Sequence, residues 1–108
     1  MTRRRVVITG LGIVSPVGNT VEEAWQNILA GRSGIAHVTK FDASTFPAQI
    51  AGEVKNFDIT DYISAKDARR MDTFIHFGMA AGIQAVRDAG LDKENSADLE
   101  RVGVAIGS

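Results

Sequence analysis

The chain has 108 residues, of which 44% are hydrophobic and 23% charged, a balance typical of a folded globular protein and not of a disordered one. Its formal net charge of −1 argues against general binding to nucleic acid or to an anionic membrane surface. Because it contains no cysteine, and because His37 and His76 are far apart, we expect no disulfide, no thiol nucleophile and no metal site in these residues.

The first residues combine a basic run, an apolar run and a glycine-rich loop. Residues 3–5 are arginines, and residues 6–8 are consecutive β-branched residues, a pattern typical of a strand covered on both faces of a parallel sheet. The arginines precede no small-residue cleavage site, and no window of about 20 apolar residues occurs. The sequence therefore predicts a cytoplasmic protein that does not span a membrane.

The loop after this strand invites comparison with the dinucleotide-binding fingerprint G-x-G-x-x-G. Gly10 and Gly12 match its first two glycines, but position 15 is Ser15. Pro16 and Gly18 then delay the helix that would hold a pyrophosphate. We therefore favour a tightly packed turn over nucleotide binding.

The next segment predicts a helix over 21–30. Thr20 and Glu23 form a capping box at its start, and Gly31 is expected as a left-handed cap at its end. Its apolar stripe includes Trp25, which is expected to be a packing anchor.

Residues 32–61 show no clear periodicity. Their scattered apolar side chains require burial, so we expect an ordered excursion and not a linker. Within it, residues 49–54 predict a short strand.

A short helix is predicted from Ser64, its expected cap. Lys66, Arg69 and Arg70 lie at positions i, i+3 and i+4, which places three cations on one helical face. Judged by spacing alone, a solvated surface is the favoured interpretation.

The longest predicted helix is capped by Asp72 or Thr73, extends to about Ala89 and is closed by Gly90. It has almost no polar face, so we expect it to be buried nearly all round. His76 is expected to be a hydrogen-bonded interior residue and not a general base. Small residues recur at helical spacing and would allow another element to approach closely: Gly78, Gly82, Ala85 and Ala89.

A second strand is predicted over 101–106, paired in parallel with the first through a right-handed crossover. Two parallel strands and an apolar helix cannot bury one another completely. The expected fold class is therefore α/β, with residues 1–108 as a single segment that opens a larger fold and is not an independent domain.

Segments along the whole chain resemble one family, the β-ketoacyl-acyl-carrier-protein synthases, and most of all their elongating type II members. The matching segments are VVITGLGIVSPVGN (6–19), GRSGI (31–35), FD (41–42), AGEV (51–54), AKDARRMD (65–72) and GVAIGS (103–108). The resemblance covers essentially all of this chain but only the amino-terminal portion of such an enzyme. It implies a thiolase-like layered α/β/α/β/α fold and a homodimer.

The resemblance also implies a function. Family members catalyse a decarboxylative Claisen condensation of an acyl thioester with malonyl-acyl-carrier protein in fatty-acid elongation, without a cofactor, through one cysteine and two histidines. None of these catalytic residues lies in residues 1–108. By resemblance, Lys66, Arg69 and Arg70 dock the acidic acyl carrier protein.

Three hypotheses remain open at this point. The first is a portion of a condensing enzyme, and the second is a non-catalytic partner subunit that resembles a chain-length factor. Only residues beyond 108 separate these two. The third, a small nucleotide-binding α/β module, is disfavoured by Ser15, Pro16 and Gly18.

Overall fold

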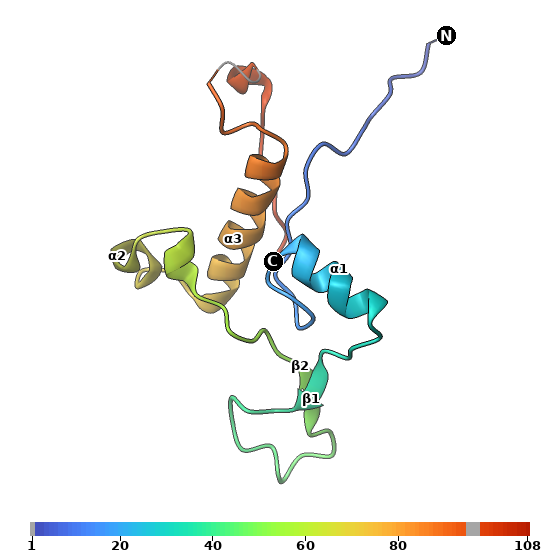
Figure 1. The fold of residues 1–108 in the computed structure, drawn as a ribbon. Helices are drawn as coiled ribbons and strands as arrows, with labels where there is room; N and C mark the ends of the chain where they lie inside the picture. The colour runs from blue at the N-terminus through green and yellow to red at the C-terminus, as the bar shows by residue number, and fades with distance from the viewer. Residues whose placement is uncertain (1, 95–97) are drawn as a thin grey trace.

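The computed structural model describes residues 2–94 and 98–108 and has a mixed α/β composition (Figure 1). Its elements are, in chain order, α1 (Val21–Leu29), β1 (Ile35–His37), β2 (Ile50–Gly52), the 3-10 helix η1 (Ile59–Asp61), α2 (Ala65–Ala68), α3 (Thr73–Asp88) and the 3-10 helix η2 (Leu99–Arg101). Among these described residues, no helix has the length and hydropathy needed to cross a bilayer.

Helix α1 forms where the capping signals predict it. Thr20 Oγ1 accepts a hydrogen bond from the backbone N–H of Glu23 at 3.2 Å. The Glu23 carboxylate accepts from the N–H of Asn19 at 3.3 Å, one residue before the cap. Gly31 follows with a φ of 70°, the left-handed conformation expected after the helix. Trp25 is 58% exposed, so the expectation of a buried packing anchor is wrong for the described residues.

The sheet is an antiparallel pair. Ile35 of β1 lies opposite Gly52 of β2, and His37 lies opposite Ile50, so β2 falls inside the predicted strand 49–54. Just beyond β2, the Glu53 carboxylate accepts hydrogen bonds from Thr39 Oγ1 at 2.9 Å and from Thr39 N at 3.1 Å. The hydroxyl bond is the main reason that the pKa of Glu53 lies below its usual value.

Helices α2 and α3 also begin at predicted caps. Ser64 Oγ accepts from the N–H of Asp67 at 3.1 Å. Asp72 is the cap of α3, because its Oδ1 accepts from the N–H of Thr73 at 2.7 Å. At the other end, Gly90 has a φ of 75°. These local signals therefore give both ends of the longest helix.

The two predicted parallel strands are not formed. Residues 6–8 run as part of an extended arm (Figure 1), and Val6 is 93% exposed. Residues 102–106 are also outside any sheet, with Val104 81% exposed. A strand requires a neighbour that completes its backbone hydrogen bonds. No such neighbour lies beside either segment within the described residues, so the predicted parallel pair is wrong for this structure.

The glycine-rich loop instead packs against α3. A Cβ on Gly12 would overlap the carbonyl oxygen of Ala81, and one on Gly10 would overlap that of Ala85. Between them, Leu11 N donates to the Asp88 carboxylate at 2.9 Å. The predicted tight turn is present between Ser15 and Gly18, whose backbone groups exchange bonds of 2.9 and 3.2 Å. Gly10 and Gly12 therefore allow close packing against α3, a role that the sequence did not predict.

The described residues bury very little apolar surface among themselves. The buried hydrophobic residues are Ala24, Ala43, Ala68 and Ala80. The radius of gyration is 17.4 Å, whereas a compact domain of this length has about 13 Å. Phe74 on α3 is 54% exposed, so the prediction that α3 is buried nearly all round is wrong here, because nothing described covers its outer face.

Candidate functional site

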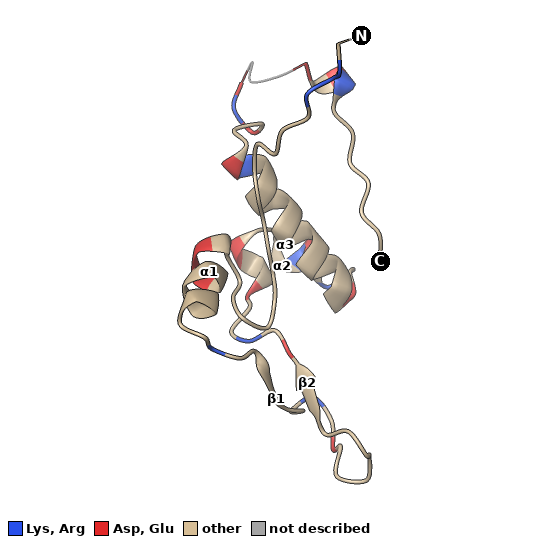
Figure 2. Ribbon diagram, turned by 90° about the vertical axis from the view of Figure 1, so that its right-hand side faces the viewer, with Lys and Arg blue, Asp and Glu red and all other residues tan. Residues whose placement is uncertain are grey.

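The three cations singled out in the sequence lie on α2 and the turn that follows it. The helical path continues past Ala68, since Arg69 N donates to Ala65 O at 3.2 Å and Arg70 N to Asp67 O at 3.1 Å. Lys66, Arg69 and Arg70 are all exposed, and Figure 2 shows the Lys and Arg positions in blue. We call these three residues the basic face.

The opposite side of α2 faces inward. Ala68 is only 8% exposed. Its carbonyl oxygen accepts from Met71 N at 3.2 Å and lies 2.8 Å from His76 Nε2 of α3. Because a carbonyl can only accept, this contact assigns the ring proton to Nε2. The prediction of a hydrogen-bonded histidine is confirmed, although the side chain is half-buried and not fully interior.

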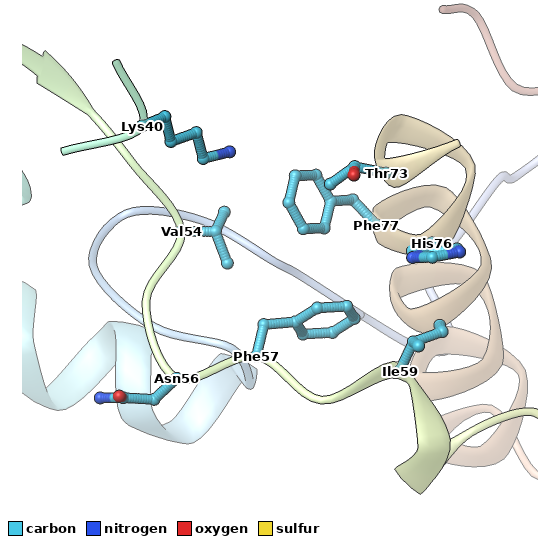
Figure 3. Close-up of a pocket in the computed structure, with 8 residues that line it drawn as sticks. All are labelled: Lys40, Val54, Asn56, Phe57, Ile59, Thr73, His76 and Phe77. Atoms are coloured by element: carbon cyan, nitrogen blue, oxygen red, sulfur yellow. The ribbon is translucent and has the colours of Figure 1, made fainter. Parts of the chain in front are cut away.

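A pocket of about 340 Å³ lies on another side of His76 (Figure 3). It is lined by Lys40, Val54, Asn56, Phe57, Ile59, Thr73, His76 and Phe77. The rings of Phe57 and Phe77 meet edge to face, with centroids 5.3 Å apart. The polar side chains of the lining, those of Lys40, Asn56, Thr73 and His76, thus lie around an aromatic surface.

The segment that precedes α2, residues 57–62, is stabilised by contacts between residues close in sequence. Asp58 caps η1, and its carboxylate accepts from Thr60 Oγ1 at 2.6 Å and from Thr60 N at 2.9 Å. The hydroxyl bond is the larger cause of a pKa below the usual value for Asp58, with the backbone bond second. In the next residues, Tyr62 stacks on Phe57 with ring centroids 6.3 Å apart.

Metal binding gains no support from the geometry. Within residues 2–94 and 98–108, no three His, Cys, Asp or Glu side chains gather as a metal-ligand cluster.

Sequence reasoning found the basic face but missed the pocket and the link between His76 and Ala68. The basic face is readable because its residues are three and four positions apart. The pocket combines residues from position 40 to position 77, and no periodic signal relates them. One feature of the sequence indicates the His76 contact: a single histidine near the start of an otherwise apolar helix needs a hydrogen-bond partner for its ring.

The comparisons with known proteins decide the family. The family model described as "Beta-ketoacyl synthase, N-terminal domain" matches residues 3–108. The chain belongs to the β-ketoacyl synthase family. It is 58% identical over 110 residues to a protein of Vibrio harveyi named 3-oxoacyl-[acyl-carrier-protein] synthase 2, covering 100% of this chain and 26% of that protein. It is 53% identical over 108 residues to a protein of the same name from Coxiella burnetii, with the same coverage.

A solved structure gives the fold. The chain is 38% identical to "The ishigamide ketosynthase/chain length factor", with a TM-score of 0.70 over 82% of this chain and 22% of that chain. The fold is therefore that of the amino-terminal part of a thiolase-like ketosynthase, as predicted. The chain spans about a quarter of the length of the curated relatives that it matches.

Proposed function

We propose that the chain is the amino-terminal part of a 3-oxoacyl-acyl-carrier-protein synthase that elongates fatty acids. The observation that carries this proposal is the 58% identity across the whole chain to a relative of that name. In the proposed reaction, a cysteine outside residues 1–108 takes the acyl group from the carrier thiol. Malonyl-carrier protein then loses CO₂, and the resulting carbanion attacks the acyl thioester and releases the cysteine thiolate. Residues 1–108 provide no catalytic side chain in this proposal and bind no cofactor.

We further propose that residues 1–108 are part of a larger layered fold and not an independent domain. A groove of about 650 Å³ separates α3 from the residues after η2 and is mostly apolar. Gly82 has open space in front of it, and Val104 and Ile106 are 81% and 62% exposed. Apolar surface of this extent is stabilised only by burial. In this proposal the remainder of the enzyme, a cytoplasmic homodimer, covers the groove.

The proposed role of the basic face is to dock the acyl carrier protein. Lys66, Arg69 and Arg70 are exposed on a short, well-capped turn, and Asp67 is the acidic residue among them. Such a surface attracts an acidic partner, mainly by raising the association rate, and salt weakens the attraction. The acyl and malonyl substrates would thus arrive as thioesters of the carrier protein.

Charge reversal in the complete synthase tests the docking proposal. Lys66→Glu with Arg69→Glu is expected to raise the KM for acyl-carrier protein about tenfold, because attraction becomes repulsion. The kcat with a small acyl-thioester surrogate is expected to stay unchanged. Steady-state kinetics with both substrates, at low and high salt, measure the difference.

Lys93→Glu with Arg101→Glu is the matched control. These exposed cations lie in the turn after α3 and in η2, so the double variant has the same charge change without altering the basic face. Equal losses with the carrier and the surrogate, or equal effects of the control pair, would contradict the docking proposal.

A partner subunit without catalytic activity is the second candidate. It is favoured by the likeness to a solved ketosynthase/chain length factor pair, at 38% identity. The two candidates differ in the nucleophile. Incubation of the complete protein with a radiolabelled acyl thioester separates them, since a synthase forms a covalent acyl-cysteine adduct and a partner subunit does not.

A further inference from the structure

We propose that His76 is a positioning residue that holds α2 so that the basic face points outward to the carrier protein. This inference rests on the docking function proposed above. The observation behind it is the 2.8 Å contact between His76 Nε2 and the carbonyl oxygen of Ala68.

Helix α2 requires such support. It has four residues, Ala65–Ala68, and a helix of one turn is not stable without tertiary contacts. Its other hydrogen bonds are local, from the cap Ser64 and within the turn up to Met71. Within the described residues, the bond from His76 is the one hydrogen bond that joins α2 to a distant element.

The bond from His76 reaches the carboxyl-terminal end of α2, where carbonyl groups lack donors within the helix. The last carbonyls of a helix lack intrahelical donors, and a histidine side chain is a known partner for them. The carbonyl of Ala68 receives one bond from Met71 N at 3.2 Å, and the imidazole supplies the second. His76 thus acts as a cap that comes from a neighbouring helix.

The anchor itself is rigid. His76 lies in the first turn of the 16-residue helix α3, and its own N–H donates to Asp72 O at 3.2 Å. The adjacent Phe77 packs edge to face on Phe57. A side chain mounted on a long, packed helix holds its partner in a narrow range of positions.

The geometry of a helical turn links this anchor to the basic face. At about 100° per residue, Lys66 and Arg70 lie about 160° from Ala68 around the helix axis, and Arg69 lies about 100° away. Fixing the Ala68 side against α3 therefore directs the cations away from α3. Without the bond, α2 keeps its packing on η1 but loses its one hydrogen bond to α3 within the described residues, so the orientation of the three charges is less tightly fixed.

Three variants of the complete synthase test this role. His76→Leu removes the hydrogen-bond donor. His76→Gln keeps an N–H group at a similar distance from the backbone, whereas the side chain in His76→Asn is too short for its N–H group to reach the carbonyl oxygen of Ala68. We expect His76→Leu and His76→Asn to raise the KM for acyl-carrier protein about threefold to tenfold, in line with one lost hydrogen bond. We expect His76→Gln to stay within about twofold of the parent, and the small surrogate to be turned over normally by all three.

Equal losses with carrier and surrogate, or a His76→Gln variant as impaired as His76→Leu, would overturn the inference. If His76→Leu does not fold, the comparison of the Gln and Asn variants decides, since both are polar and differ in reach. Adding His76→Leu to Lys66→Glu and Arg69→Glu should cause no further rise in KM, because the face it orients is already lost.

The two proposals fail in different ways. If charge reversal has no carrier-specific effect, docking at the basic face is wrong. If charge reversal acts but His76→Leu and His76→Asn do not, docking stands and His76 has no positioning role.

Discussion

The loop of residues 13–19 and the outer face of α3 differ in how far their groups find partners within the described residues. The loop satisfies several of its backbone polar groups within the described residues, although Oδ1 of Asn19 is buried there without a hydrogen-bond partner. Gln84 of α3 accepts from Ile13 N at 3.1 Å and donates to Asn19 O at 2.7 Å. The outer face of α3 leaves apolar side chains open, as at Phe74. Backbone polar groups of the loop find nearby partners, whereas the apolar side chains on the outer face of α3 have no cover within the described residues.

Lys55 provides further hydrogen bonds to backbone groups in this part of the molecule. Its ammonium group donates to the carbonyl oxygens of Pro16, Gly34 and Glu53 at 3.2, 3.3 and 3.0 Å. Asn19 Nδ2 donates to Lys55 O at 2.7 Å. The side chains of Lys55 and Asn19 thus join the loop of residues 13–19 to the segments beside β1 and β2.

The largest effect is expected from the polypeptide of residues 1–108 studied alone. Its apolar faces are exposed and its buried hydrophobic residues are all alanines, so we expect aggregation or loose structure. Thermal unfolding followed by near-ultraviolet circular dichroism should show no cooperative transition. A sharp transition with a strong near-ultraviolet signal would show that residues 1–108 fold by themselves despite their exposed apolar side chains.

A pair of glycine substitutions in the complete synthase is expected to have the next largest effect. Gly12→Ala forces a Cβ against the backbone of α3 at Ala81 and should lower stability by about 1–3 kcal/mol. Gly82→Ala meets open space in the described residues, where it would stabilise by about 0.5–1 kcal/mol.

We expect Gly82→Ala to destabilise instead, because the proposed cover of the groove approaches α3 closely. Thermal midpoints of the two variants, compared with the parent enzyme, measure both effects. A rise in the midpoint for Gly82→Ala would mean that this side of α3 stays open in the complete protein.

The smallest effect is expected at Lys55. Lys55→Met removes three hydrogen bonds from a partly solvated ammonium group, so we expect a loss of about 1–2 kcal/mol. Lys93→Met is the control and should change stability by less than about 0.5 kcal/mol. Denaturant unfolding of both variants gives the comparison. Matching values would show that the carbonyl contacts of Lys55 add nothing to stability.

The exposure of α3 does not conflict with the family assignment. A thiolase-like fold places helices between sheets, and the described residues supply neither sheet in full. The two unpaired segments, 6–8 and 102–106, have the composition of buried strands but lack neighbours within the described residues. Their sequence is therefore typical of buried strands, whereas in the structure both segments lie outside any sheet and are exposed.

The sequence by itself determined the ends of the helices and the family. Thr20, Ser64, Gly31 and Gly90 act on groups within a few residues of themselves, so their signals are readable without tertiary information. Tertiary structure alone decided that Gly12 packs on α3, that β1 pairs with β2 and that His76 reaches Ala68. These contacts depend on which distant surfaces meet, and spacing along the chain does not encode that.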